Sequence, residues 1–313
     1  MLSRVAERTY WLARYLERAE DTARLLLVQH LSSLDLPGEA RPDWGLLLDV
    51  LSAREAFEAL PGGVNENNVV RYMFIDRENP SSLVSSLTFA RENMRTTREV
   101  LPSEAWEQVN SLYLSVARRS TKGLPRSSRH SVLNSVIKSC QQITGMLSGT
   151  MSHDEAYQFL RVGRMLERVD MSSRFIDVGT EKLLQGGEET LPYQNVLWSS
   201  VLQSLSAYQM YRLRVQSSVT PRNVVEFLLR DRHFPRALVH SLLELEASMQ
   251  LLPANEKALK AVRSTIRRLR HYRIDISATT AETASLHAFL DDLQADVQVV
   301  HKAIDETWFH QEF

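Results

Sequence analysis

Two groups of charged residues are of the types that proton transfer or cation binding would use. The first group is Arg14, Glu17, Arg18, Glu20 and Arg24, and the second is Arg164, Glu167, Arg168, Asp170 and Arg174. The second group follows the first at a constant offset of 150 positions, and only Glu20 and Asp170 differ in type. We interpret this agreement in charge and spacing as an internal duplication.

The first group lies on a predicted amphipathic helix. At about 100° per residue, Leu16 marks the centre of an apolar stripe. The stripe also contains Val5, Thr9, Leu12, Ala19, Ala23 and Leu27. Glu20 falls inside this stripe, and Glu17 and Arg24 fall along one edge. Arg18 points away from it, so we expect the Arg18→Ala substitution to change thermal stability little.

The second group repeats this arrangement on a second predicted helix. Its apolar stripe consists of Phe159, Val162, Leu166, Val169 and Ser173. Asp170 takes the inner position, and Glu167 and Arg174 take the edge. Arg168 lies on the far side. In both copies the inner acid precedes an arginine by four residues, which is the better orientation for a helical ion pair.

Two interpretations of these acid–base groups remain open. In the structural one the ions pair with each other and with neighbouring helices, because a half-buried charge without a partner is costly. Replacing Glu20 or Asp170 by Ala would then destabilise the fold by roughly 3–5 kcal/mol. In the functional one the acids serve a metal or a proton transfer. Their spacing matches no known set of metal ligands, so we favour the structural interpretation and assign no catalytic residue.

Three further arginines could bind an anion. Arg91, Arg95 and Arg98 share one side of a predicted helix by their i,i+4 and i,i+3 spacing. Unpaired, they would form an anion-binding face. The alternative is that Glu92, Glu99 and acids of neighbouring helices neutralise them.

Composition narrows the classes of fold and partner. The 313 residues include only 11 Gly and 10 Pro, a shortage that favours long helices with few turns. The 37 basic and 38 acidic residues nearly balance, so no nucleic-acid or anionic-membrane partner is expected. With Cys140 as the only cysteine, an intramolecular disulfide is excluded. No metal and no cofactor is predicted.

Helix signals dominate the chain, and convincing strand patterns are absent. Helix starts are predicted at Asn79-Pro80, at the capping box Ser152-His-Asp-Glu155 and at Thr220-Pro221. Continuous helices are expected over 43–60 and 192–215. The predicted fold is all-α, with ten to thirteen helices in two pseudo-symmetric bundles from the internal duplication, packed into one compact body. The expected halves are 1–150 and 151–313.

Several classes of function lack their motifs. The chain has no Gly-rich phosphate loop, no nucleophile elbow and no His-Glu-x-x-His sequence. It has neither the apolar segment of a signal peptide nor a run of about 18 apolar residues, so we expect a soluble, cytoplasmic protein. One enzymatic alternative is a Mg-diphosphate site of the all-α prenyl-synthase kind, imitated by Glu17-x-x-x-Asp21 and Asp291-Asp292-x-x-x-Asp296. The arginines around Glu17 argue against it.

Three segments resemble one known family. The residues from Tyr10 to Arg24, Gly163 to Asp170 and Ala90-Arg91-Glu92-Asn93 are similar to the bacterial alpha-E domain family, and the resemblance covers nearly the whole chain. That family is predicted to be all-helical and is named for its Glu-Arg motif. Its genes commonly neighbour those of ATP-grasp proteins and transglutaminase-like proteases.

The resemblance implies a part in an ATP-dependent system that ligates or modifies peptides, but it transfers no catalytic residue. Our leading hypothesis is an accessory helical protein that binds an ATP-grasp amidoligase, a transglutaminase-like protein or their peptide. The alternative is an enzyme that acts on a peptide or amide through the Glu/Arg centre. A closed ion network with an exposed apolar patch would favour the first, and an open pocket with an available acid the second. Whether the chain forms a homo-oligomer is left open.

Overall fold

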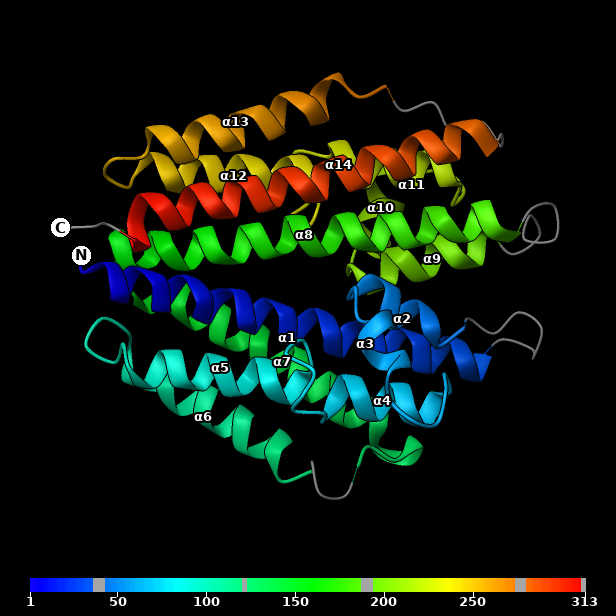
Figure 1. The fold of residues 1–313 in the computed structure, drawn as a ribbon, viewed down its shortest axis with the longest axis horizontal. Coiled ribbons are helices and arrows are strands. Elements are labelled where there is room, and N and C mark those ends of the chain that lie inside the picture. The colour runs from blue at the N-terminus through cyan, green and yellow to red at the C-terminus, as the bar shows by residue number, and fades with distance from the viewer. Residues whose placement is uncertain (36–42, 120–122, 187–193, 274–279, 311–313) are drawn as a thin grey trace. The chain divides into compact units, whose positions relative to one another are not determined.

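A computed structural model of the chain describes residues 1–35, 43–119, 123–186, 194–273 and 280–310 (Figure 1). These residues form fourteen α-helices and a final π-helical turn, and no strand occurs among them. The all-α prediction is confirmed. The number of helices exceeds the predicted ten to thirteen, because two predicted helices are each broken in two.

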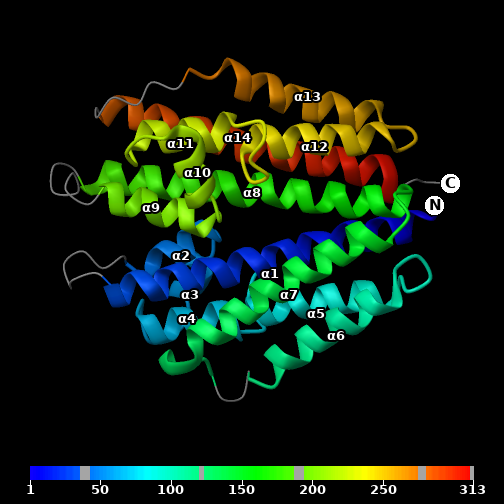
Figure 2. The same cartoon turned by 180° about the vertical axis from the view of Figure 1, so that it is seen from behind.

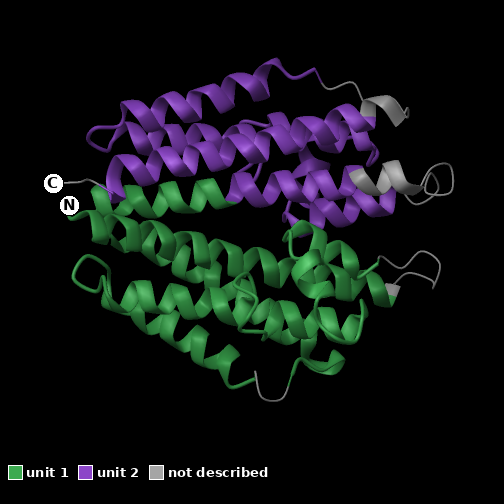
Figure 3. Cartoon of the chain, viewed as in Figure 1, with its two compact units in different colours: residues 1–167 green, residues 168–313 purple. Residues whose placement is uncertain are grey.

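The chain divides into two compact units, Met1–Glu167 and Arg168–Phe313 (Figure 3). The boundary falls inside one helix, α8, which runs from Glu155 to Gly186. The predicted halves, their origin in a duplication and their pseudo-symmetry stay predictions.

The first unit is built around α1. Its helices are α1 (Ser3–Asp35), α2 (Gly45–Val50), α3 (Arg54–Glu58), α4 (Glu66–Phe74), α5 (Leu83–Arg95), α6 (Ser103–Ala117), α7 (Arg126–Thr150) and the first part of α8. Helix α1 packs against α5 and α7, and α6 packs against the same two helices (Figures 1 and 2). The predicted stripe of α1 is buried except at Leu27, which is partly exposed. Because neighbours cover α1 on several sides, more than its apolar stripe is buried.

The second unit contains the rest of α8 and six further helices. They are α9 (Gln194–Ser204), α10 (Tyr208–Val215), α11 (Pro221–Arg230), α12 (Leu238–Gln250), α13 (Glu256–His271) and α14 (Thr280–Ile304), followed by the π-helical turn Asp305–Phe309. Helix α13 packs against α12 and α14, and α11 packs against α9 and α12. Trp308 is buried and its indole Nε1 donates to the carbonyl oxygen of Pro253 at 2.8 Å. The last turn is thereby held against the connection between α12 and α13.

Two predicted helices are interrupted at serines. The helix expected over 43–60 ends at Val50 and restarts at Arg54, and Ser52 between them has φ +51°. The helix expected over 192–215 ends at Ser204 and restarts at Tyr208, with Ser206 at φ +52°. A left-handed residue ends a helix, and this position is usually taken by Gly or Asn. Serine gave no such signal in the sequence.

The predicted helix caps are right at one position and displaced at two. Thr220 accepts a hydrogen bond from the amide of Asn223, and Pro221 is the first residue of α11, as predicted. Helix α5 is capped by Ser82, three residues after Asn79. Helix α8 is capped by Asp154 instead of Ser152, because the Asp154 carboxylate accepts the amides of residues 156 and 157 at 3.0 and 3.3 Å.

Within the described ranges, no helix combines the length and the apolar character that crossing a membrane requires.

Candidate functional site

Glu167 is held by two arginines of α1, and we call Arg14, Arg18 and Glu167 the motif cluster. The Glu167 side chain has no exposed surface. Its Oε2 accepts from Arg14 Nε at 2.6 Å and from Arg18 Nη2 at 3.1 Å, and its Oε1 accepts from Arg18 Nε at 2.6 Å. Both carboxylate oxygens are therefore occupied by guanidinium groups from the first copy of the motif.

The position of Arg18 corrects the sequence analysis. We expected Arg18 to point away from the core, but its side chain is only 17% exposed and pairs with Glu167. The helical angles locate Arg18 correctly with respect to the apolar stripe of α1. However, they carry no information about α8, whose first part covers a different side of the same helix.

The electrostatics of the motif cluster keep Glu167 ionised. Burial acts to raise the pKa of Glu167, but Arg18 and Arg14 outweigh it and lower the pKa below its ordinary value. Arg14 Nη1 also donates to the hydroxyl of Tyr10 at 3.1 Å. Burial raises the pKa of Tyr10 to about 12, so this phenol stays protonated at neutral pH.

A glycine lets the two motif-bearing helices approach each other. A Cβ added at Gly163 would lie 3.0 Å from the carbonyl carbon of Tyr10 and still closer to its oxygen. Real Cβ atoms essentially never come so near to backbone, so only Gly fits here. This close approach puts α8 beside α1, where Glu167 meets Arg14 and Arg18.

A second buried polar group lies further along α1. Glu20 pairs with Arg24, as predicted from their spacing, and also accepts from Gln141 Nε2 at 3.3 Å. Both Glu20 and Glu17 are buried. Cys140 of α7 is buried beside them, and its pKa is raised well above the usual value, first by burial and then by the negative charge of Glu20. Cys140 is therefore a neutral thiol and unsuited to act as a nucleophile.

The second copy of the motif is divided between the two units. Asp170 pairs with Arg174 at 2.9 Å within the second unit, as their spacing predicted. Arg168 belongs to the same unit and Arg164 to the first, and both are partly exposed.

A known protein family is described by the same features, predicted helices and a Glu-Arg motif. Residues 1–309 match the model of the Alpha-E family, described as a predicted alpha-helical domain with a conserved ER motif. The chain belongs to the Alpha-E family.

Curated relatives of this Alpha-E chain include two mycobacterial proteins. They are Uncharacterized protein Mb2597 of Mycobacterium bovis and Uncharacterized protein Rv2567 of Mycobacterium tuberculosis. Each is 23% identical over 329 residues, which cover 94% of this chain and 36% of the relative. The chain thus spans about a third of the length of these relatives. No solved structure matches it.

The three arginines expected to form an anion-binding face have different surroundings. Helix α5 ends at Arg95, so Arg98 lies beyond the helix. Arg95 pairs with Glu92 at 2.6 Å. Arg91 and Arg98 instead lie over the ring of Trp106, at 5.6 and 3.9 Å from its centroid. Arg95 is thus neutralised by its own helix, and anion binding by the other two stays a prediction.

Sequence reasoning missed an ion cluster in the first unit, in which only Arg129 is buried. Glu66 accepts from Arg126 Nε at 2.6 Å and from Arg129 Nη1 at 2.7 Å. Arg129 is almost completely buried and also lies 3.4 Å from His30 Nδ1. The i,i+3 spacing of Arg126 and Arg129 was the one sequence signal.

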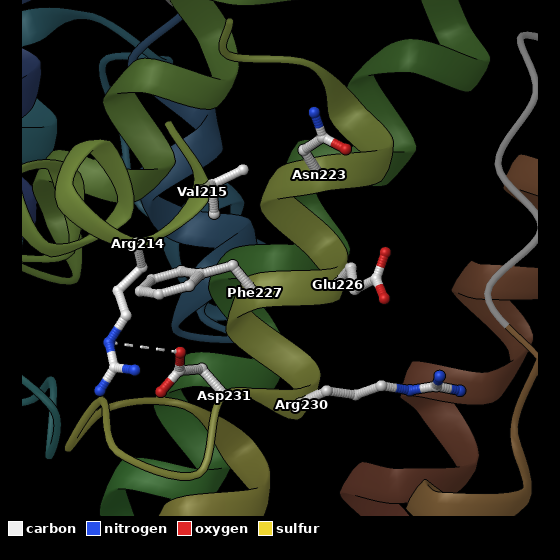
Figure 4. A pocket seen from close by; sticks show the side chains of 7 residues that line it. All are labelled: Arg214, Val215, Asn223, Glu226, Phe227, Arg230 and Asp231. Atoms are coloured by element: carbon white, nitrogen blue, oxygen red, sulfur yellow. Dashed lines mark ion pairs between the residues drawn. The ribbon is translucent and has the colours of Figure 1, made fainter. Parts of the chain in front are cut away.

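No motif residue lines either of two open hollows on the described surface. One, of about 360 Å³, lies between α10 and α11, where Arg214 reaches toward Asp231 at 3.9 Å (Figure 4). The other, of about 320 Å³, lies on α6 beside Trp106.

Two of the acids proposed for a Mg-diphosphate site, Asp292 and Asp296, pair with Arg268. Arg268 donates to Asp292 at 3.0 Å and to Asp296 at 2.7 Å. Glu17 and Asp21 are buried in the first unit. Nothing in these surroundings favours the prenyl-synthase alternative.

Proposed function

We propose that this Alpha-E chain is a cytoplasmic accessory protein that binds an ATP-grasp amidoligase, a transglutaminase-like protein or their peptide in a peptide-ligating or peptide-modifying system. The observation that carries this proposal is the closure of the motif cluster. Glu167 has no exposed surface, and guanidinium groups occupy both of its oxygens.

Such a carboxylate is poorly suited to acid–base catalysis. A catalytic acid or base must reach the proton that it transfers, and its pKa should lie near the working pH. The pKa of Glu167 is lowered by Arg18 and Arg14, which makes its carboxylate a weaker base. Its geometry is instead that of a buried ion cluster that fixes α8 against α1. The motif then stabilises the fold of the domain, and the partner is recognised by residues on the surface instead.

The first unit offers an aromatic surface for a partner. The rings of Trp11 and Tyr15 are stacked with centroids 5.4 Å apart, and Tyr15 lies 5.1 Å from Phe89. We call Trp11, Tyr15 and Phe89 the aromatic row. Phe89 is 41% exposed, and the other two are partly exposed. Exposed aromatic side chains are enriched at the centres of protein interfaces, so this row supports partner binding.

The mycobacterial relatives add a further argument. The match covers 36% of each relative, so in those proteins the matching region is covalently joined to a longer stretch of other chain. A domain that is joined to other segments in its relatives is suited to working next to another protein.

The proposal is tested by co-expressing the chain with the ATP-grasp and transglutaminase-like products of its own gene neighbourhood. We expect a stable complex by co-purification, with Phe89→Ser weakening it at least about tenfold. Leu213→Ser is the matched control, because Leu213 is 66% exposed in the other unit. Without any complex the accessory function is wrong.

The same complex separates the accessory protein from the enzyme. In a Glu167→Gln variant that is folded by circular dichroism, we expect the complex and the ATP turnover of the ligase to persist. Loss of product formation by an intact complex would instead make the motif cluster an active site on a peptide or amide.

A further inference from the structure

In the second unit, one imidazole and two carboxylates converge from helices that are far apart in the sequence. Asp177 lies on α8, and His287 and Asp291 lie on α14. One candidate ligand atom from each residue lies within 4.8 Å of the corresponding atoms of the other two. We predicted no metal from the sequence, in which Asp291 belonged only to the disfavoured Mg-diphosphate alternative, and none of these three residues belongs to the Glu-Arg motif.

His287 lies between the two acids. Its Nδ1 is 2.5 Å from Asp177 Oδ1, and its Nε2 is 3.6 Å from Asp291 Oδ2. On α14, Asp291 follows His287 by four residues, which places both on the same face of that helix. The helix thus presents a nitrogen and an oxygen ligand together to the carboxylate of Asp177.

The remaining surroundings are also those of a metal site. Gln294, one turn beyond Asp291 on α14, donates from Nε2 to Asp177 Oδ2 at 3.2 Å, which orients this carboxylate. The side chains are 13% exposed at Asp177, 37% at His287 and 59% at Asp291. The group is therefore shielded from solvent at Asp177 and open to solvent at Asp291, so an ion can enter from the side of Asp291.

We propose that Asp177, His287 and Asp291 bind a divalent transition-metal ion, with Zn²⁺ as the best match. A mixed set of one imidazole and two carboxylates suits Zn²⁺, whereas Mg²⁺ and Ca²⁺ prefer oxygen ligands alone. In a tetrahedral Zn²⁺ site with bonds of about 2.0–2.1 Å, ligand atoms lie roughly 3.4 Å apart. An imidazole gives only one nitrogen to an ion, so the partly exposed His287 and the exposed Asp291 would turn from their present contacts to bring one nitrogen and one oxygen to that spacing.

Three protein ligands leave one tetrahedral position for a water molecule or an external ligand. The ion would link α8 to α14 and add a cation between two acids. This site is independent of the proposed accessory function, because it shares no residue with the motif cluster or the aromatic row.

The test is calorimetric titration of tag-free, chelator-treated protein with ZnCl₂, and separately with MgCl₂. We expect one equivalent of Zn²⁺ to bind and no comparable binding of Mg²⁺. His287→Ala, Asp177→Asn and Asp291→Asn should each weaken Zn²⁺ binding by about tenfold or more. Circular dichroism melting of the metal-free variants confirms that each is folded, and Asp177→Asn keeps the shape of the side chain.

The matched control is His310→Ala. His310 Nδ1 lies 3.1 Å from Asp305 Oδ1 in the same unit, but this His–Asp pair has no third ligand among the described residues. Zn²⁺ binding should be unchanged in this variant. The proposal is overturned if the wild-type protein binds no Zn²⁺, or if His287→Ala and His310→Ala bind it equally well. In either case His287 serves only as a hydrogen-bonding bridge between the two carboxylates.

Discussion

Arg18 and Arg14 hold the same buried carboxylate, so neither can be removed without leaving Glu167 short of a partner. We predict that Arg18→Ala lowers the free energy of unfolding toward the lower end of roughly 3–5 kcal/mol, since Arg14 still pairs with Glu167. Urea denaturation followed by circular dichroism measures this change. Arg95→Ala is the control, because the Arg95–Glu92 pair is exposed and its loss should not be measurable. Equal stabilities for the two variants would contradict a structural role of the motif cluster.

Arg18 also shows which kind of contact could not be predicted from the sequence. The spacing of charges predicted the Glu20–Arg24 and Asp170–Arg174 pairs, because both partners lie on one helix. The pairing of Arg18 with Glu167 joins two residues that are 149 positions apart and lie on different helices. Angles on a single helix cannot show which neighbour covers its second side, and so Arg18 was misplaced.

Glu66 makes stability depend on pH in the acid range. Hydrogen bonding from Arg126 is the largest cause that lowers the pKa of Glu66 from 4.5 to about 2. A lowered folded-state pKa stabilises the fold above the unfolded pKa, and this stabilisation is lost as the pH falls. We predict that the difference in unfolding free energy between wild type and Glu66→Gln is constant above about pH 5 and shrinks between about pH 4.5 and 2.

Urea denaturation at a series of pH values measures that difference. Other carboxylates titrate in both proteins, so the comparison isolates Glu66 itself. A difference that stays constant down to about pH 2 would show that folding does not lower the pKa of Glu66.

At the level of helices, Gly163 sets how closely α8 approaches α1. We predict that Gly163→Ala destabilises the protein by about 1–3 kcal/mol or more, because the added methyl group meets the backbone of Tyr10. Gly145→Ala on α7 is the matched control, since nothing lies within 4 Å of a Cβ built there. Removing an exposed helical glycine should stabilise by about 0.5–1 kcal/mol. Thermal melting of both variants checks the opposite signs, and a stabilising Gly163→Ala would contradict the close helix packing.

Apolar spacing and capping residues predicted some features of the helices, but they did not predict every break. The buried stripes around Leu16 and Leu166 followed from apolar spacing alone, and the start of α11 followed from Thr220 and Pro221. The breaks at Ser52 and Ser206 could not be predicted, because neither position carries the Gly or Pro that usually ends a helix. Both serines are exposed, and each helix end closes by a backbone hydrogen bond, from Ala53 to Leu48 and from Ala207 to Leu202, which does not depend on the type of side chain.

For the whole chain, the near balance of 37 basic and 38 acidic residues predicts weak binding to polyanions. Even the arginines of α13 are partly neutralised, since Arg263 pairs with Glu246 and Arg268 with Asp296. We expect the protein to elute from a heparin column at or below physiological salt. Retention that falls steeply with salt, over several logarithmic units, would instead reveal an unpaired basic surface.

Contacts between residues far apart in the sequence were the feature that could be predicted least well. The i,i+4 spacing of His287 and Asp291 was visible on one helix, but Asp177 lies 110 positions away from His287. Their meeting depends on how α8 and α14 pack in the second unit. Without knowledge of that packing, the histidine could not be distinguished from an ordinary surface residue.

The division of the chain inside α8 has a consequence for how this protein can be dissected genetically. Most domain boundaries fall in exposed linkers, where cutting the gene leaves two self-contained products. Here a cut after Glu167 would sever a helix, expose new unpaired backbone groups at both ends and separate the motif glutamate from the arginine that follows it. We therefore expect that neither half folds independently when the gene is split after Glu167. Limited proteolysis should likewise produce no stable fragments that end at this position. We expect insertions to be tolerated in the connections between helices instead.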